Sequence, residues 1–256
     1  GRRVLRPEAA ATLADLLEVF PPRGWFPPVT PGTKFVTLGG CVAADVHGKN
    51  HHRDGSFGAH VEELELMLAD GARARCSPTE NAELFRATVG GMGLTGVITE
   101  VALRLKFVET SYMIVRHHAA RDLEESLALL DDPVYDDEYT VGWVDLLARG
   151  RRAGRGVLMR GQHARASELP REFRERGGVR TRARFDLPFD LPSWALNRLA
   201  ASAFNKFYYQ AQGRRRAPYV SDFDGFFYPL DSVGGWNRAY GKRGFVQYQC
   251  VLPMNE

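Results

Sequence analysis

Cysteine is scarce in this sequence of 256 residues, which has three cysteines and no CxxC pair. Cys41, Cys76 and Cys250 are widely spaced and odd in number, which argues against a disulfide scaffold and against a structural zinc site. Long apolar runs are also missing, since none approaches the roughly 18 residues that a membrane-spanning helix needs. No signal peptide opens the chain. We therefore expect neither a transmembrane segment nor a disulfide framework in this sequence.

A large excess of one charge is also absent, because the formal net charge is +3. This balance is far from that of a dedicated nucleic-acid-binding protein, so we expect no nucleic acid among its partners. The arginines nevertheless gather in two places, 149–160 and 214–216. Such clusters are either solvated loops or a patch for an anionic ligand or for lipid headgroups.

The chain has enough apolar residues for a sizeable core, at 44% of the sequence against 25% charged residues. Its length fits one large domain or two ordinary ones. Apolar residues at helical spacing predict a helix over 7–20. Alternating residues predict a hairpin over 61–76 that turns at Asp70-Gly71, and a strand over 97–105.

The pattern changes after about residue 108. An amphipathic helix is predicted over 122–132, and an irregular stretch rich in proline and arginine follows at 165–200. Further strands are predicted over 139–147, 154–162 and 244–253. The sequence therefore predicts an α+β fold in two regions, with a boundary near 106–112.

Two glycine-rich segments invite comparison with phosphate-binding loops. Gly91–Gly96 reads "GMGLTG" and matches the G-x-G-x-x-G fingerprint. A dinucleotide-binding loop must follow a buried strand and open a helix, whereas here a helical pattern precedes the motif and a strand pattern follows it. We therefore interpret it as a tight turn that brings the backbone close to a neighbour or a ligand.

The other segment reads "VTLGG" and ends at Gly39-Gly40. We predict a short strand over 34–38 that runs into the paired glycines. Successive backbone N–H groups at this point form either a nest for an anion or a plain hairpin bend.

Histidines gather just after the paired glycines, in "DVHGKNHH". His47 and His51 are four residues apart, which would put both on one face of a helix as metal ligands. Gly48 makes a helix here improbable, and no third ligand completes a metal site, so no metal is expected. The remaining interpretations are a surface loop with incidental histidines and a ligand-facing loop, in which histidine acts as donor or base and Lys49 adds positive charge.

Three groups of segments together resemble a known family. They are "PGTKFVTLGGCVAADVHGKNHHRDGSFGAHV", "AELFRATVGGMGLTGVI" and "FYPLD…WNRAYG…GFVQYQCVLP". The chain resembles the decaprenylphosphoryl-β-D-ribose 2′-oxidases, which are FAD-linked oxidases with the PCMH-type (vanillyl-alcohol oxidase) fold. The resemblance implies FAD as cofactor, an FAD-binding domain over 1–108 and a substrate-binding domain with an antiparallel sheet over 109–256. It also implies a fragment, with the family's first phosphate loop upstream of Gly1 and further chain beyond Glu256.

The resemblance also implies the site residues. The FAD contacts would be Gly32, Thr37, Leu38, Gly39, Gly40, Ala44, Asp45, Val46, His47 and the main chain of Ile98. On the substrate side, His47 would position or deprotonate the hydroxyl, and Lys49 would steady developing negative charge. Tyr248 would close the pocket over the sugar.

The implied reaction is oxidation of the 2′-hydroxyl of polyprenylphosphoryl-β-D-ribose to the 2′-keto sugar, the first half of an epimerisation that supplies arabinose for cell-wall arabinan. A partner keto-reductase would complete it, quinone or oxygen would accept the electrons, and the protein would contact a membrane peripherally. The apolar stretch 185–209 is either a groove for the prenyl tail or ordinary core with a cover loop. Alternatives are an alditol or sugar-1,4-lactone oxidase and a non-catalytic flavin-binding fragment.

Overall fold

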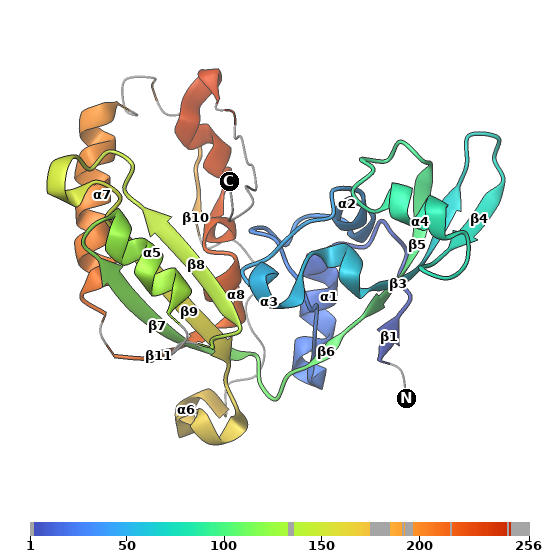
Figure 1. Cartoon of the computed structure of the whole chain (residues 1–256), viewed down its shortest axis with the longest axis horizontal. Coiled ribbons are helices and arrows are strands. Elements are labelled where there is room, and N and C mark those ends of the chain that lie inside the picture. The colour runs from blue at the N-terminus through green and yellow to red at the C-terminus, as the bar shows by residue number, and fades with distance from the viewer. Residues whose placement is uncertain are drawn as a thin grey trace.

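The computed structural model describes residues 3–132, 136–174, 185–190, 192, 197–215, 217–244 and 246. These residues form two lobes, each built on a four-stranded sheet (Figure 1). All neighbouring strands within both four-stranded sheets are antiparallel. The predicted α+β class is therefore confirmed. No helix in the described part of the chain combines the length and the apolar character that crossing a bilayer requires.

The first lobe has the strand order β1-β5-β3-β4. Its elements are β1 (Val4–Leu5), α1 (Leu13–Val19), η1 (Pro21–Arg23), β2 (Trp25–Phe26), α2 (Leu38–Ala43), α3 (His51–Asp54), η2 (Phe57–His60), β3 (Val61–Met67), β4 (Arg73–Cys76), α4 (Ala82–Thr88), β5 (Val97–Arg104) and β6 (Lys106–Phe107). The predicted hairpin is confirmed as β3 and β4, and Gly71 has φ +84° at its turn. The strand predicted over 97–105 is confirmed as β5.

The first helix is shorter than predicted. It was expected over 7–20, but α1 begins at Leu13 because Thr12 and Asp15 form a capping box. The Asp15 amide donates to the Thr12 hydroxyl over 3.2 Å, and the Thr12 amide donates to the Asp15 carboxylate over 2.7 Å. These two bonds satisfy donors that a helix end otherwise leaves open, so they fix the start of the helix. Upstream of these two bonds, Glu8 forms an isolated antiparallel β-bridge with Glu100 of β5.

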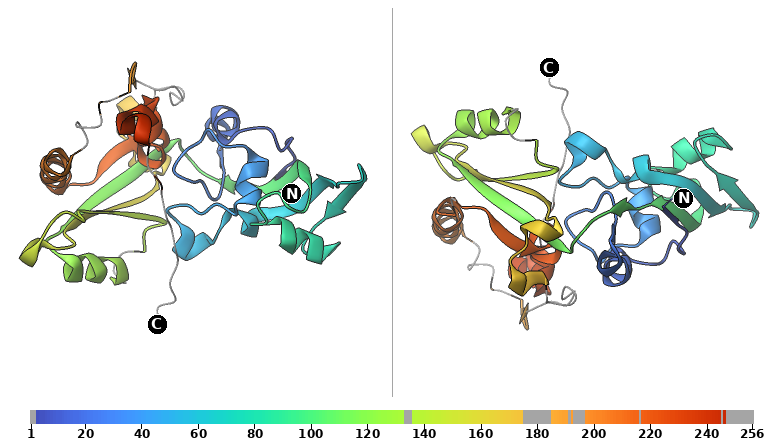
Figure 2. Two further views of the ribbon diagram at one scale, coloured as in Figure 1. Left: turned by 90° about the horizontal axis from the view of Figure 1, so that it is seen from above. Right: turned by 90° about the horizontal axis from the view of Figure 1, so that it is seen from below.

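The second lobe has the strand order β11-β7-β9-β8. Its elements are β7 (Tyr112–Ala120), α5 (Leu123–Asp131), β8 (Tyr139–Val144), η3 (Gly150–Arg152), β9 (Gly156–His163), η4 (Ala166–Glu168), α6 (Arg171–Arg174), β10 (Phe185–Asp186), α7 (Arg198–Gly213), β11 (Tyr219–Asp222), α8 (Phe223–Phe227), η5 (Leu230–Ser232), β12 (Val233–Gly234) and η6 (Trp236–Arg243). The views in Figure 2 show α5 and α7 on opposite faces of this sheet, and both helices contact β7 and β9.

Three sequence predictions for the second lobe are confirmed, namely the helix at 122–132 and the strands at 139–147 and 154–162. The final strand predicted over 244–253 lies almost wholly outside the described residues. The long helix α7 was not predicted, and it starts inside the stretch expected to be irregular. Its N-cap is Asn197, whose side-chain oxygen accepts from the amides of Leu199 and Ala200 over 2.8 and 2.9 Å. The apolar stretch 185–209 is therefore helical from Arg198 onward.

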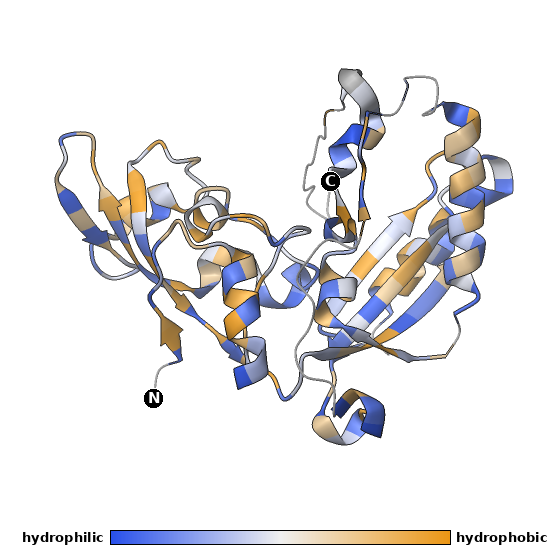
Figure 3. Cartoon of the chain, turned by 180° about the vertical axis from the view of Figure 1, so that it is seen from behind, coloured by the Kyte–Doolittle hydropathy of each residue, from blue (hydrophilic) through white to orange (hydrophobic). Residues whose placement is uncertain are grey.

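One hydrophobic core runs through both lobes, and the apolar residues of Figure 3 follow the strands of both sheets. The Phe26 ring of the first lobe lies 5.4 Å from the ring centroids of Phe223 and Phe227 in the second. The Tyr139 ring packs edge-on against Phe227 at 4.8 Å. The chain passes between the sheets after β6, where the domain boundary was predicted. That boundary stays a prediction, because the shared core joins the two sides.

Buried polar contacts also join the lobes. The ammonium of Lys34, whose side chain is 1% exposed, pairs with the carboxylate of Asp224. The Lys34 amide donates to the carboxylate of Asp231 over 2.9 Å, and the hydroxyls of Thr30 and Tyr228 share a hydrogen bond. Segment 30–34 of the first lobe thereby holds segment 224–231 of the second.

This buried pair gives a stability prediction. Lys34→Met leaves the Asp224 carboxylate buried without its cation, and we expect a loss of about 3–5 kcal/mol of unfolding free energy in urea titrations. The control is Arg6→Gln, because Arg6 pairs with Glu63 over 2.6 Å with a side chain 49% exposed, and exposed pairs contribute less than about 1 kcal/mol. Adding Asp224→Leu to Lys34→Met should recover part of the loss. Equal effects of Lys34→Met and Arg6→Gln would contradict the prediction.

Candidate functional site

The paired glycines lie in a helix rather than at a strand end. The strand predicted over 34–38 is wrong, because Thr37 caps α2 and its hydroxyl accepts from the Gly40 amide over 3.1 Å. The anion nest is wrong as well. The amides of Leu38 and Gly39 donate to the carbonyls of Ala11 and Ala9 over 2.8 and 2.9 Å, so they face the protein. Segment 9–11 takes up these donors by running alongside the start of the helix.

The outer side of this corner carries small, exposed residues. Gly40 and Ala44 are four residues apart at α2 and are both exposed, so they share one side of it. Thr37 and His47 are exposed too, whereas Leu38 is fully buried. A Cβ atom at the exposed Gly32 would meet nothing within 4 Å. A flat group therefore has room to approach the backbone here.

Asp45 fixes the shape of this corner. Its φ is +41°, a conformation uncommon for residues other than glycine. Its carboxylate accepts from the Ser56 hydroxyl and from the Gly58 amide, both over 2.8 Å. Gly58 has no room for a side chain, because a Cβ there would lie 2.3 Å from the Val89 side chain. The Asp45 side chain therefore positions the backbone on either side of it.

The second glycine loop packs against the same corner. The amides of Gly90 and Met92 donate to the carbonyls of Val42 and Ala43 over 3.0 and 2.8 Å. The interpretation of "GMGLTG" as a tight turn is confirmed, because Gly96 has φ +148° and its Cβ would lie 2.7 Å from the Met67 carbonyl. Met92 is 72% exposed despite its apolar side chain. The loop thus adds apolar surface beside the small residues of α2.

Ile98, the last of the predicted FAD contacts in the sequence, lies in β5 directly after this loop. It pairs with Leu66 of β3, and its half-buried side chain packs against the core. Its side chain is therefore committed to the fold, in keeping with the expectation that only its main chain faces a ligand.

The histidines lie at the junction of the lobes. No helix spans His47 and His51, as predicted, because α3 begins only after Asn50. The two rings nevertheless meet edge-on with centroids 5.8 Å apart. Across the described ranges, no group of three or more His, Cys, Asp or Glu side chains is placed to hold a metal ion.

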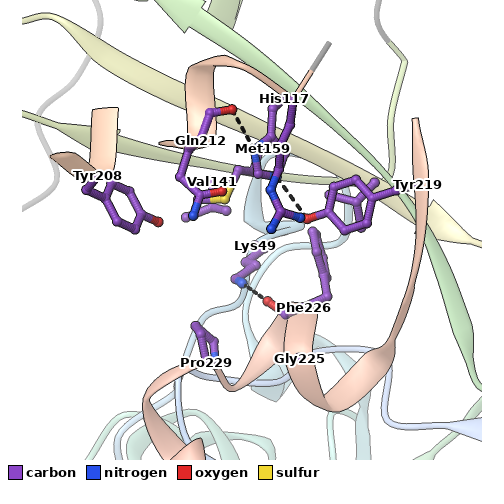
Figure 4. A pocket seen from close by; sticks show the side chains of 12 residues that line it. Lys49, His117, Val141, Met159, Tyr208, Gln212, Tyr219, Gly225, Phe226 and Pro229 are labelled. Carbon is purple, nitrogen blue, oxygen red and sulfur yellow. Dashed lines mark hydrogen bonds between the residues drawn. The ribbon is translucent and has the colours of Figure 1, made fainter. Parts of the chain in front are cut away.

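A cavity of about 190 Å³ opens beside this junction, between α7 and the sheet of the second lobe (Figure 4). Its lining residues are Lys49, Val115, His117, Val141, Met159, Tyr208, Gln212, Arg215, Tyr219, Gly225, Phe226 and Pro229. Val115, His117, Val141 and Met159 occupy alternate positions of β7, β8 and β9, so one face of the sheet forms part of the wall. Lys49 reaches it from the first lobe.

Both the main chain and the side chain of Lys49 are held by the second lobe. Its carbonyl accepts from the Thr140 amide over 2.8 Å, and its ammonium donates to the Phe226 carbonyl. The ammonium also lies 4.5 Å from the centroid of the Phe226 ring, within reach of a cation–π attraction. Burial lowers the pKa of Lys49 to about 8, because an apolar setting disfavours the charged form. Gly48 permits this path, since a Cβ there would lie 2.8 Å from the Thr30 carbonyl.

His117 is the centre of the polar side of the cavity. Its Nε2 lies 3.0 Å from the Tyr219 hydroxyl and its Nδ1 lies 3.4 Å from the Gln212 carbonyl (Figure 4). Burial lowers the pKa of His117, so the ring is neutral near pH 7. A neutral ring donates one of these bonds and accepts at the other nitrogen, which fixes its orientation toward the cavity.

The structure brings one of the three predicted substrate-side residues into this cavity. Lys49 lines it, His47 is exposed beside His51 and is not part of the lining, and Tyr248 lies outside the described residues. Sequence reasoning missed His117 and Gln212. The signals were present: "YMIVRHHAA" alternates as a strand, and "NKFYYQAQG" places Tyr208 and Gln212 one helical turn apart.

Comparison with known proteins bears on this site. Residues 2–77 match a family model described as an FAD binding domain. The chain is 35% identical to the decaprenylphosphoryl-beta-D-ribose oxidase of Mycolicibacterium smegmatis, over 99% of this chain and 55% of that protein. The chain therefore carries part of an FAD binding domain and is similar to an FAD-linked oxidase. The predicted cofactor, FAD, and the PCMH-type fold are thereby confirmed.

Two further relatives of the chain are informative. An uncharacterized protein of Streptomyces coelicolor is 37% identical over 94% of this chain and 66% of its own length. A putative D-arabinono-1,4-lactone oxidase of Neurospora crassa is 30% identical over 38% of this chain and 17% of its own length. The chain thus spans a little over half of the Mycolicibacterium protein and about two thirds of the Streptomyces protein.

The residues present fit an FAD group. The exposed small residues of α2 and the exposed Met92, whose amide donates to the Ala43 carbonyl, offer a surface on which a flat ring system can lie against backbone, and Gly32 is open as well. The α2 amides are already taken, so they do not hold the phosphates of FAD. Of the predicted contacts from Gly32 to His47, Gly32, Thr37, Gly40, Ala44 and His47 are exposed, Gly39, Asp45 and Val46 are partly buried, and Leu38 is buried in the core. Their role as FAD contacts stays a prediction.

Gly32 tests this assignment. Gly32→Ala adds a methyl group where the protein itself has space, so we expect no loss of thermal stability in the absence of FAD. If FAD lies on this surface, the methyl group separates it from the backbone, and the affinity for FAD measured by fluorescence quenching falls at least about tenfold. Gly142→Ala, on β8 of the second lobe, is the control for a methyl group added elsewhere, although its Cβ would lie 3.3 Å from the Leu158 side chain. Unchanged FAD affinity in Gly32→Ala would contradict the assignment.

Proposed function

We propose that this protein oxidises the 2′-hydroxyl of a polyprenylphosphoryl-β-D-ribose to the 2′-keto sugar, using FAD. The observation that carries the proposal is the similarity to decaprenylphosphoryl-beta-D-ribose oxidase over 99% of the chain. The cavity beside Lys49 supports it, because Lys49 closely follows the residues proposed to contact FAD in the chain and the cavity carries polar groups suited to a sugar. The product is the substrate for a keto-reductase that completes the epimerisation to the arabinose donor for cell-wall arabinan.

FAD supplies the redox chemistry when bound, taking up a hydride from the carbon that bears the hydroxyl. The protein orients that carbon and manages the proton of the hydroxyl. Lys49 is the buried cation of the cavity, and in its charged form it stabilises negative charge that develops on the sugar oxygen. His47, three residues beyond Ala44 of the FAD surface, is the proposed proton acceptor. Tyr248 is the proposed residue that closes over the sugar.

The surroundings of the reaction follow from the substrate. A prenyl tail requires access to a lipid surface, so we propose peripheral membrane contact. Quinone or oxygen would be the electron acceptor. Oxidation of a free alditol or a sugar-1,4-lactone is the second candidate, because the chain is also similar to the putative D-arabinono-1,4-lactone oxidase of Neurospora crassa. A flavin-binding protein without catalysis is the third.

Flavin reduction separates these candidates. Under anaerobic conditions, we expect farnesylphosphoryl-β-D-ribose to bleach the oxidised flavin absorbance, because the sugar enters the cavity and the lipid phosphate anchors it. Free alditols and sugar lactones should bleach it at least about a hundredfold more slowly, which corresponds to about 2.8 kcal/mol of lost transition-state binding. His47→Ala should bind FAD and slow the bleaching. Bleaching by alditols or lactones alone would overturn the substrate, and no bleaching by any of them would favour the non-catalytic alternative.

A further inference from the structure

Two cations line the cavity, and they come from different parts of the molecule. Lys49 enters from the first lobe, and Arg215 follows the C-terminal end of α7. None of the cavity's lining residues is acidic. Neither cation forms an ion pair with a carboxylate in the part of the chain that the structure describes. Among the described residues, the positive charge of the cavity therefore has no carboxylate partner.

Arg215 is held in place but remains exposed to solvent. Its guanidinium carbon lies 5.0 Å from the centroid of the Tyr219 ring, so a cation–π contact orients it. The Tyr219 hydroxyl is in turn fixed by His117 over 3.0 Å. This arrangement limits the motion of the guanidinium without occupying it with a carboxylate. One of its donors hydrogen-bonds the Tyr219 side chain, and the remaining donors can reach a ligand in the cavity.

The other arginine cluster shows the contrast. Arg155 forms a 2.7 Å ion pair with the buried Asp145 carboxylate, and Arg160 is buried and donates to the Leu129 carbonyl. These two stabilise the second lobe, whereas Arg149, Arg151 and Arg152 are exposed on the η3 turn. Arg215 thus combines a fixed position with an open guanidinium at a cavity.

The chemistry around Arg215 fits a phosphate group. A guanidinium presents a planar fork of N–H donors that matches phosphate oxygens in geometry and in charge. Tyr208 and Gln212 line the same wall from α7 and add a hydroxyl and an amide. Lys49 contributes a second positive charge from the other lobe. A neutral sugar alone would not need both cations.

We propose that Arg215 binds the phosphate of the lipid-linked sugar and thereby selects phosphorylated substrates. This subsite rests on the proposed function for the identity of its ligand, and it names the residue that recognises the phosphate. The sugar then occupies the cavity between Arg215 and Lys49, and the phosphate holds it while the hydroxyl is oxidised.

The direct test is calorimetric titration of the FAD-loaded protein with farnesyl phosphate and, separately, with farnesol. We expect the wild-type protein to bind farnesyl phosphate at least tenfold more tightly than farnesol. Arg215→Gln should lose this preference, because its side chain keeps hydrogen-bonding groups and loses the charge. Arg214→Gln removes a neighbouring exposed charge outside the cavity lining and should bind as the wild type does. Wild-type affinity in Arg215→Gln would overturn the subsite.

Two further ligands separate the sources of phosphate. Inorganic phosphate should compete with farnesyl phosphate in the wild-type protein and fail to do so in Arg215→Gln. Vesicles containing phosphatidylglycerol test whether the arginines merely contact a lipid surface. If Arg214→Gln and Arg215→Gln weaken vesicle binding equally and neither affects farnesyl phosphate, the subsite is wrong.

Kinetics distinguish failure of the subsite from failure of the proposed function. With farnesylphosphoryl-β-D-ribose, Arg215→Gln should raise KM at least tenfold and leave kcat near the wild-type value, because the lost contact is made equally before and during the reaction. An unchanged KM overturns the subsite and leaves the oxidation standing. Phosphate-dependent binding through Arg215 in a protein whose flavin the ribosyl substrate does not reduce supports the subsite and overturns the proposed reaction.

Discussion

The hydrogen bond from the Lys49 ammonium to the Phe226 carbonyl is the contact on which the site depends. It holds the Lys49 side chain, which follows the corner formed by α2 and Asp45, at a cavity of the second lobe. The Thr140 amide donates to the Lys49 carbonyl at the same point, so a strand of the second lobe holds the backbone of the first lobe in place. Burial then lowers the pKa of the ammonium to about 8, so its charge is sensitive to pH just above neutrality.

Strands and helices with clear periodicity were predictable because their local pattern agrees with the tertiary environment. The hairpin of β3 and β4 and the strand β5 follow their alternating pattern, and the apolar repeat of α5 forms a helix although several of its leucines stay exposed. The strand predicted over 34–38 is wrong. Apolar residues such as Phe35 and Leu38 suggested an extended segment, but the Thr37 hydroxyl caps the start of a helix. The late start of α1 has the same cause, since a capping threonine outweighs the upstream alanines.

The candidate site was predictable on its first-lobe side and hidden on the other. Lys49 follows from its motif, and the close backbone approach follows from the glycines. Arg215 and His117 come from segments separated by about a hundred residues, and only the packing of α7 on β7 brings them to one wall. No local sequence pattern predicts that packing. The anion nest at Gly39 failed for a related reason, since the partner of its amide is the distant Ala9 carbonyl.

The most direct measurement is the pH dependence of anaerobic flavin reduction by farnesylphosphoryl-β-D-ribose in the wild-type protein and in Lys49→Arg. Because burial lowers the pKa of Lys49, its positive charge is present below pH 8 and is lost as the pH rises through about 8. The wild-type rate should therefore fall across that range. Lys49→Arg keeps its charge and should show a flat profile there. A wild-type rate that stays level up to pH 10, or the same fall in Lys49→Arg, would contradict the assignment of Lys49 as the buried cation that acts on the substrate.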